Sequence, residues 1–182
     1  SLTEQLVARC ARPIDHATRS RAVWHWLDWM ACVAVARRTP VAQALLAWRL
    51  PGPHGHTPAW PCLAGMAHSD MQAICLDAGL ANVEEMDDMH REAILHPGPV
   101  VLPVVAHLAR HHGLTLARAL DAVVHGYEVM IRIGRSLGPA HYARWHNTAT
   151  AGLLGAAASA AHALGLSPQQ TVGALGNAGT QA

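Results

Sequence analysis

The fold of this chain is constrained most strongly by a series of apolar runs with helical spacing, each bounded by capping or turn residues. Between residues 16 and 36, apolar side chains recur at intervals of three and four, which is the period of one face of a helix. These residues are Val23, Trp24, Leu27, Met30 and Ala34. No run of useful length alternates between polar and apolar residues, as a half-buried strand would. The sequence therefore predicts an all-α fold.

Capping chemistry marks the ends of the expected helices. Thr39-Pro40 and Ser167-Pro168 each combine an N-cap side chain with proline at the first helical position. Ser69 and Thr115 are further N-caps, and Gly113 follows an apolar run as a helix stop. We expect about seven or eight helices in a single domain that covers residues 1–182. Their expected ranges are 2–10, 16–36, 40–49, 70–80, 99–112, 116–137, 148–164 and 168–182, with a loop at 51–61.

Composition argues against several classes of function. Hydrophobic residues make up 51% of the chain and its formal net charge is +1, which favours a globular protein and gives no electrostatic basis for binding nucleic acid. The uncharged run at 148–166 is long enough to raise the question of a membrane span. Its Ala, Gly, Ser and Thr residues are only weakly apolar, so we expect a buried helix and no membrane partner. The four cysteines fit no metal or iron–sulfur spacing, and we expect a reduced, cytoplasmic protein.

A cluster of titratable side chains breaks the apolar pattern at residues 84–98. Four of the five residues from 84 to 88 are acidic, and two histidines, His90 and His96, precede or enter a His-Pro-Gly turn. Such groups are costly to bury and have no use in packing, so their density indicates a site. A second polar patch, at 138–150, has the same character. We interpret the two patches as halves of one polar pocket.

Five sequence blocks in a fixed order carry a resemblance to a known family. They are 85–90 (EMDDMH), 95–98 (LHPG), 126–134 (GYEVMIRIG), 146–152 (HNTATAG) and 174–182 (ALGNAGTQA). In this order they resemble the 2-methylcitrate dehydratase family (MmgE/PrpD), which also includes cis-aconitate decarboxylase and iminodisuccinate epimerase. The resemblance is strongest from about residue 77 to residue 182, and it implies the helical domain of that family.

The resemblance implies a lyase or isomerase that removes water or carbon dioxide from small di- or tricarboxylates, or epimerises them. It implies no cofactor, no metal, and a homodimer formed by the helical domain. His96 and His146 match the active-site histidines of the family, which implies proton transfer and contact with substrate carboxylates. Asp87 and Asp88 match its acidic pair, and one or the other would orient a histidine or a substrate hydroxyl. Further candidates for substrate binding are Arg91, His90, Arg144 and Thr148.

Several features leave other interpretations open. Members of the family are longer and have a smaller α+β lid domain that supplies lysines, whereas this chain contains no lysine. We therefore expect that the chain lacks the lid and is weak or inactive alone, and that a separate polypeptide could supply the missing domain. The alternative is a truncated, inactive relative that binds a carboxylate or a partner. Asn147 and Met89 stand where proline and threonine are common in the family.

The same residues also allow simpler roles. Asp87 or Asp88 could cap a helix, and His96 could be a loop histidine whose hydrogen bonds are satisfied locally. Arg144 could be a solvated surface charge. A third functional alternative is a metal site, which we rank last because the family is metal-independent. Its candidate ligands are Asp87, Asp88, His90, His96 and His146.

Overall fold

The chain folds into a set of helices, as the spacing of its apolar residues predicts. The computed structural model describes residues 1–48, 60–63, 65–67 and 69–182. In chain order the described elements are α1 (Leu2–Cys10), α2 (His16–Ala36), α3 (Pro40–Ala47), β1 (Trp60–Cys62), β2 (Gly65–Ala67), α4 (Asp70–Asn82), α5 (Gly98–His112), α6 (Leu116–Tyr142), α7 (Asn147–Leu164) and α8 (Pro168–Gly179). The prediction of an all-α fold is confirmed.

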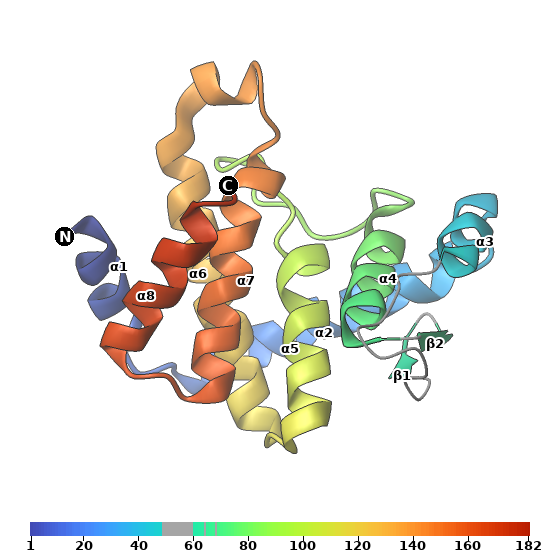
Figure 1. Cartoon of the computed structure of the whole chain (residues 1–182), viewed down its shortest axis with the longest axis horizontal. Coiled ribbons are helices and arrows are strands. Elements are labelled where there is room, and N and C mark those ends of the chain that lie inside the picture. Colours follow the sequence, from blue (N-terminus) through green and yellow to red (C-terminus); the bar gives the residue numbers. More distant parts are fainter. Residues whose placement is uncertain (49–59, 64, 68) are drawn as a thin grey trace.

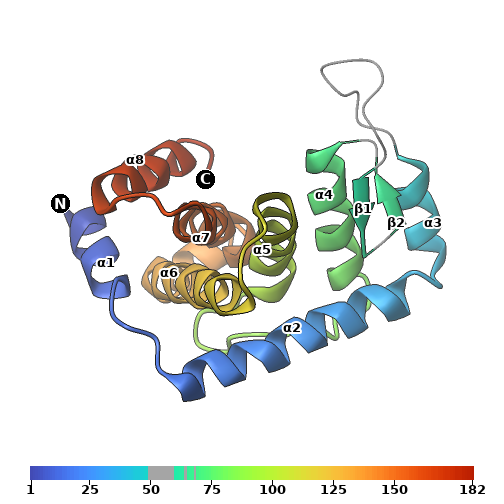
Figure 2. The same cartoon turned by 90° about the horizontal axis from the view of Figure 1, so that it is seen from below.

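Helices α5, α6, α7 and α8 stand side by side, with α7 packed against each of the other three (Figure 1). Helix α2 runs across one side of this group and continues to α4 (Figure 2). It therefore connects α4 to the group formed by α5, α6, α7 and α8. Helix α1 packs on α8 and α6. The larger core cluster draws residues from α2, α4, α5, α6 and α7. This arrangement brings the loop between α4 and α5 against the N-terminal turn of α7.

Local capping explains where most helices begin and end. The Thr39, Ser69, Thr115 and Ser167 side chains each accept a hydrogen bond from a backbone N–H in the first turn of the helix that follows. At the other end of α5, Gly113 adopts a left-handed conformation with φ of 61°, which glycine reaches without a steric penalty. Because these signals are local, the sequence alone was sufficient to predict them.

Helices α6 and α7 approach each other closely because glycines face one another at their contact. A Cβ atom added at Gly155 would lie 2.7 Å from the Cβ of Met130 and 3.1 Å from the carbonyl oxygen of Gly126. Gly152 and Ser159 lie on the same helix and are buried, as the small-residue pattern of α7 predicts. Among the described residues, no helix is long and apolar enough to span a membrane.

The structure differs from the sequence-based expectation in several places. A short antiparallel ribbon pairs Trp60–Cys62 with Gly65–Ala67, because strands of three residues are too short to show an alternating pattern. The expected loop at 51–61 lies outside the described residues except at its end, where β1 already begins. Helix α3 ends at Ala47 rather than at residue 49. Gly138, with φ of 69°, interrupts α6 as expected, but a further helical turn follows it up to Tyr142.

Candidate functional site

The loop at 83–97, between α4 and α5, is folded back on itself. The backbone N–H of His90 donates to the carbonyl oxygen of Leu95 at 2.9 Å, and His90 Nδ1 accepts from the N–H of Ala93 at 3.2 Å. Glu85 and Ile94 have positive φ values of 48° and 50°, a conformation that side chains with a Cβ rarely adopt. These contacts hold the loop so that Asp87, Asp88 and His96 face the helices around it.

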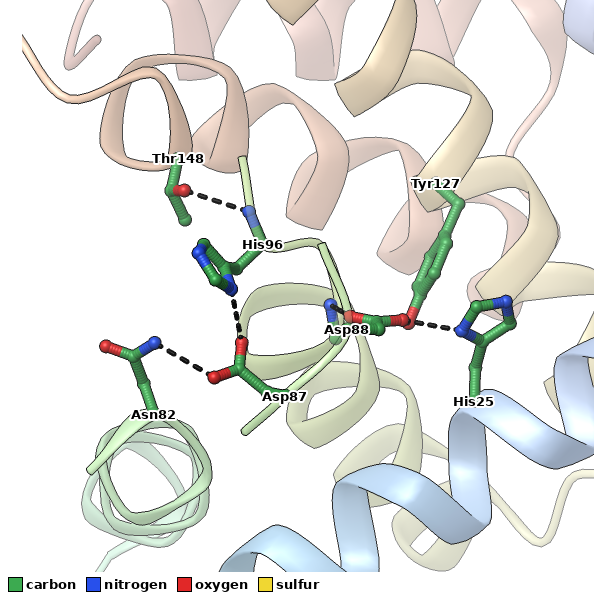
Figure 3. Close-up of polar contacts among 8 residues, drawn as sticks. His25, Asn82, Asp87, Asp88, His96, Tyr127 and Thr148 are labelled. Atoms are coloured by element: carbon green, nitrogen blue, oxygen red, sulfur yellow. Dashed lines mark hydrogen bonds and ion pairs between the residues drawn. The ribbon is translucent and has the colours of Figure 1, made fainter. Parts of the chain in front are cut away.

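Asp87 and His96 form a buried carboxylate–imidazole pair. Asp87 Oδ2 lies 2.8 Å from His96 Nδ1, and the amide of Asn82, at the end of α4, donates to Asp87 Oδ1 at 3.1 Å (Figure 3). The side chain of Asp87 is only 1% exposed, whereas that of His96 is 23% exposed. The carboxylate is therefore fixed inside the protein, while one edge of the imidazole reaches the surface.

Asp88 is directed away from this pair and joins three other elements. Its Oδ2 accepts from the Tyr127 hydroxyl at 2.7 Å and lies 2.6 Å from His25 Nδ1, and its Oδ1 accepts from the N–H of Gly98 at 2.9 Å (Figure 3). Burial and the negative charge of Asp88 raise the pKa of Tyr127 well above its ordinary value, so this phenol stays a neutral donor. Asp88 thus links the loop to α2, to the first residue of α5 and to the middle of α6.

The two polar stretches meet at a pocket of about 470 Å³ between α4, α5 and α7. His96, His146 and Thr148 line it together with Asn82 and a set of apolar side chains from these helices. The N–H of His96 donates to Thr148 Oγ1 at 3.0 Å, which ties the loop to the first turn of α7. The prediction that residues 85–98 and 141–150 lie close together is therefore confirmed.

The first turns of two helices border this pocket. Pro99 and Val100 belong to the start of α5, and Thr148 and Ala149 to the start of α7. His146 is the N-cap residue of α7, makes no capping hydrogen bond and is exposed. Because a helix N-terminus has positive potential from its aligned peptide dipoles, the start of α7 favours an anionic ligand here, whereas the Gly98 N–H at the start of α5 already donates to Asp88.

The remaining predicted residues lie around the pocket rather than in its wall. Arg91 and Arg144 are exposed, and neither is among the described residues that line the pocket. The His90 ring is engaged with the loop backbone. Roles for these three side chains in substrate binding stay predictions. Asp87 and Asp88 contact different partners, and of the two only Asp87 contacts His96.

Asn147 and Met89 stand where the resemblance leads us to expect proline and threonine. The Asn147 amide donates to the carbonyl oxygen of Ala93 at 2.8 Å and is buried, so it adds a second tie between α7 and the loop. Met89 is 54% exposed. Sequence reasoning missed Asn82, His25 and Tyr127 as partners of the aspartates. His25 lies on α2, 63 positions before Asp88 in the sequence. No local sequence pattern signals such a contact.

Comparison with known proteins identifies the family. A family model described as the MmgE/PrpD N-terminal domain matches residues 2–182. The chain is 30% identical to a cis-aconitate decarboxylase from Aspergillus terreus over 176 residues, which cover 89% of this chain and 34% of that protein. It is 34% identical to the cis-aconitate decarboxylase-like protein oryM from Aspergillus oryzae over 119 residues, which cover 60% of this chain and 25% of that protein. The chain thus spans about a third or less of the length of these relatives. It belongs to the MmgE/PrpD family.

Proposed function

We propose that this chain contributes the proton-transfer part of an active site that acts on a small di- or tricarboxylate. The reaction class is that of a lyase or isomerase: loss of water, loss of carbon dioxide, or epimerisation at a carbon beside a carboxylate. The observation that carries the proposal is the buried Asp87 carboxylate held against His96 at the edge of the pocket. Because the chain spans only about a third of the cis-aconitate decarboxylase that it resembles, the activity is proposed for the protein as a whole.

The Asp87–His96 pair has the geometry of an oriented general base. With Nδ1–H donating to Asp87 Oδ2, His96 carries its proton on Nδ1, and Nε2 is the nitrogen left to accept a proton from a substrate. The buried carboxylate also stabilises the imidazolium that forms when Nε2 takes that proton. Asn82 occupies the other oxygen of Asp87, so the carboxylate cannot rotate away without losing a hydrogen bond.

The rest of the pocket suits a carboxylate ligand. Negative charge develops on the substrate when a proton or carbon dioxide leaves a carbon beside a carboxylate, and preorganised positive potential stabilises it. The first turn of α7 supplies such potential at the pocket. Thr148 Oγ1 accepts from the N–H of His96, which leaves its hydroxyl proton available for a substrate oxygen. His146, exposed at the pocket edge, is the second candidate for contact with the substrate or for proton transfer.

We further propose that the protein is a cytoplasmic homodimer. Its four cysteines are free, as in proteins of reducing compartments. Helix α2 exposes several large apolar side chains, and a cluster of this kind is typical of an interface. The exposed residues are Val23, Trp24, Leu27, Met30 and Val35. A separate polypeptide that completes the site is an additional partner that this proposal allows.

The test is turnover by the His96→Gln variant of the protein, with cis-aconitate as the first probe and citrate and 2-methylcitrate as the others. Products are followed by NMR, and folding is checked by circular dichroism. The matched control is His112→Gln, which removes an exposed histidine at the end of α5, away from the pocket. We expect activity to be lost in the first variant and kept in the second. Equal activity in both would refute the role of His96. Binding without turnover in the wild type would support the alternative of a carboxylate-binding module.

A further inference from the structure

A second group of polar side chains lies where the N-terminus of α4 meets the C-terminal half of α5. Asp70 is the first residue of α4, and His107 and His111 lie four residues apart on α5. Residues at this spacing lie on the same face of a helix. One ligand atom from each of the three side chains lies within 4.8 Å of the other two. Asp70 Oδ1 is 3.5 Å from His107 Nε2.

The carboxylate oxygen at this position is poorly satisfied by the protein. Asp70 Oδ1 is buried and has no hydrogen-bond partner among the residues that the structure describes. The 3.5 Å separation from His107 is an ion-pair distance and too long for a good hydrogen bond. A buried anionic oxygen with one imidazole nitrogen at 3.5 Å and a ligand atom of His111 within 4.8 Å is well placed to share a cation with the two histidines.

We propose that Asp70, His107 and His111 bind a divalent transition-metal ion of the zinc type. Two imidazoles and one carboxylate form a ligand set that such ions accept, with a further position open to water. Two ligands at about 2.0–2.1 Å from a tetrahedral ion lie roughly 3.4 Å apart, which matches the separation of Asp70 Oδ1 and His107 Nε2. The rings of His107 and His111 are nearly parallel, with an interplanar angle of 17° and centroids 6.1 Å apart. His111 is exposed at the edge of this pair and supplies the third ligand atom of the group.

The surroundings leave room for a cation. The side chain of Asp70 is 47% exposed, so an ion can enter from solvent. Arg110 contributes an opposing charge near His107, but it is an exposed residue, and solvent screens such a charge. The negative charge of Asp70 offsets part of the charge that a divalent ion brings.

The ion would fasten α4 to α5 at the end opposite the candidate pocket. The last residue of α4, Asn82, contacts Asp87, and α5 begins two residues after His96. Asp70 lies 12 positions before Asn82, which is about 18 Å along a helix. The metal site shares no residue with the pocket. Its role is to hold the helix pair that carries Asp87 and His96, and the ion takes no part in the reaction.

The proposal is tested by titrating the tag-free, chelator-treated protein with Zn²⁺ in a calorimeter. The matched variants are His111→Ala and His112→Ala, since both positions are exposed and adjacent and only His111 belongs to the cluster. Asp70→Asn is a second test variant that keeps the shape of the side chain and the Ser69 N-cap. We expect one Zn²⁺ per chain in the wild type and in His112→Ala. His111→Ala and Asp70→Asn should bind on the order of 100-fold more weakly, because even loss of an outer partner of a metal ligand costs roughly 10- to 100-fold.

Thermal unfolding gives an independent readout. One equivalent of Zn²⁺ should raise the Tm of the wild type and of His112→Ala and leave that of His111→Ala unchanged, because an ion stabilises only the state that binds it. Equal titration of the wild type and His111→Ala would show adventitious binding among the 14 histidines and overturn the proposal. A zinc concentration of about 100 µM is well above the dissociation constant expected of a folded three-ligand site. If the wild type binds no Zn²⁺ at that concentration, the proposal is overturned as well.

Discussion

Replacing Asp88 with alanine should destabilise the fold far more than a typical loop substitution. Asp88 receives hydrogen bonds from the Tyr127 hydroxyl and the Gly98 N–H and pairs with His25. The substitution removes all three contacts and leaves the Tyr127 hydroxyl without its partner. Since Tyr127 is largely buried, water cannot easily replace the lost acceptor. We therefore assign Asp88 to holding the helices together.

The magnitude follows from these contacts. A hydrogen bond to a charged group contributes about 1.5–3 kcal/mol, so three would sum to roughly 4.5–9 kcal/mol if they were independent. They share one carboxylate that is 14% exposed, so the sum overestimates the effect. Removing one partner of a buried ion pair costs about 3–5 kcal/mol. We expect Asp88→Ala to lower the free energy of unfolding by about 3–5 kcal/mol, and Tyr127→Phe to lower it by about 2 kcal/mol.

The assay is equilibrium unfolding in urea, followed by far-UV circular dichroism, with the free energy taken from the midpoint and slope. Glu84→Ala is the matched control, because Glu84 is acidic, belongs to the same stretch and is exposed; it should change stability by less than about 0.5 kcal/mol. In the Asp88→Ala background, Tyr127→Phe should cost almost nothing, because the partner of the hydroxyl is already gone. An Asp88→Ala variant within about 1 kcal/mol of the wild type, or an equal cost of Tyr127→Phe in both backgrounds, would refute this reasoning.

Two further predictions concern the helix contacts. Gly155→Ala should lower the free energy of unfolding by about 1–3 kcal/mol, since the new Cβ would lie 2.7 Å from the Cβ of Met130. At Gly173 a new Cβ would meet nothing within 4 Å, so Gly173→Ala should raise the free energy of unfolding by about 0.5–1 kcal/mol through helix propensity. Urea unfolding that ranks the two variants the other way would contradict the packing of α6 on α7. His125 stacks on His162 with ring centroids 4.0 Å apart, and burial, followed by the charge of His162, lowers the pKa of His125 from 6.5 to about 4. Between pH 6.5 and about pH 4 the folded state therefore binds fewer protons at His125 than the unfolded state does. The free energy of unfolding falls as the pH decreases from 6.5, and the loss is complete below about pH 4. The full shift corresponds to about 3.4 kcal/mol, and partial exposure reduces the expected loss to about 2 kcal/mol. Between about pH 7 and 4.5 the free energy of unfolding should fall more for the wild type than for His125→Leu, and parallel curves would contradict this prediction.

Much of the fold could be predicted because its signals are local. N-caps such as Ser69 and Thr115 act on backbone groups within one turn, and a helical apolar period is visible in any window. The β1–β2 ribbon was missed because three residues per strand carry no periodicity. The closeness of residues 85–98 and 141–150 was predicted from two polar breaks between apolar helices, and the His96–Thr148 hydrogen bond confirms it.

The division of labour between Asp87 and Asp88 was not visible in the sequence. Adjacent residues in an irregular loop can face opposite sides, and which side each takes depends on partners far away in the chain. The partner of Asp87 is nine positions ahead, whereas His25 and Tyr127 lie 63 and 39 positions from Asp88. The Asp70, His107 and His111 group was missed for the same reason, since its members come together only through the packing of α4 on α5.

Turnover by the Asp87→Asn variant of the protein tests the proposed role of the Asp87–His96 pair most directly. An asparagine amide keeps the shape of the side chain but can donate to His96 Nδ1, which would place the imidazole proton on Nε2 and block the nitrogen that faces the substrate. With a tricarboxylate such as cis-aconitate followed by NMR, kcat should fall by about 100-fold or more while KM changes little, and circular dichroism should show an intact fold. A variant that folds normally and keeps kcat within about threefold of the wild type would contradict the assignment of His96, oriented by Asp87, as the proton-transfer group.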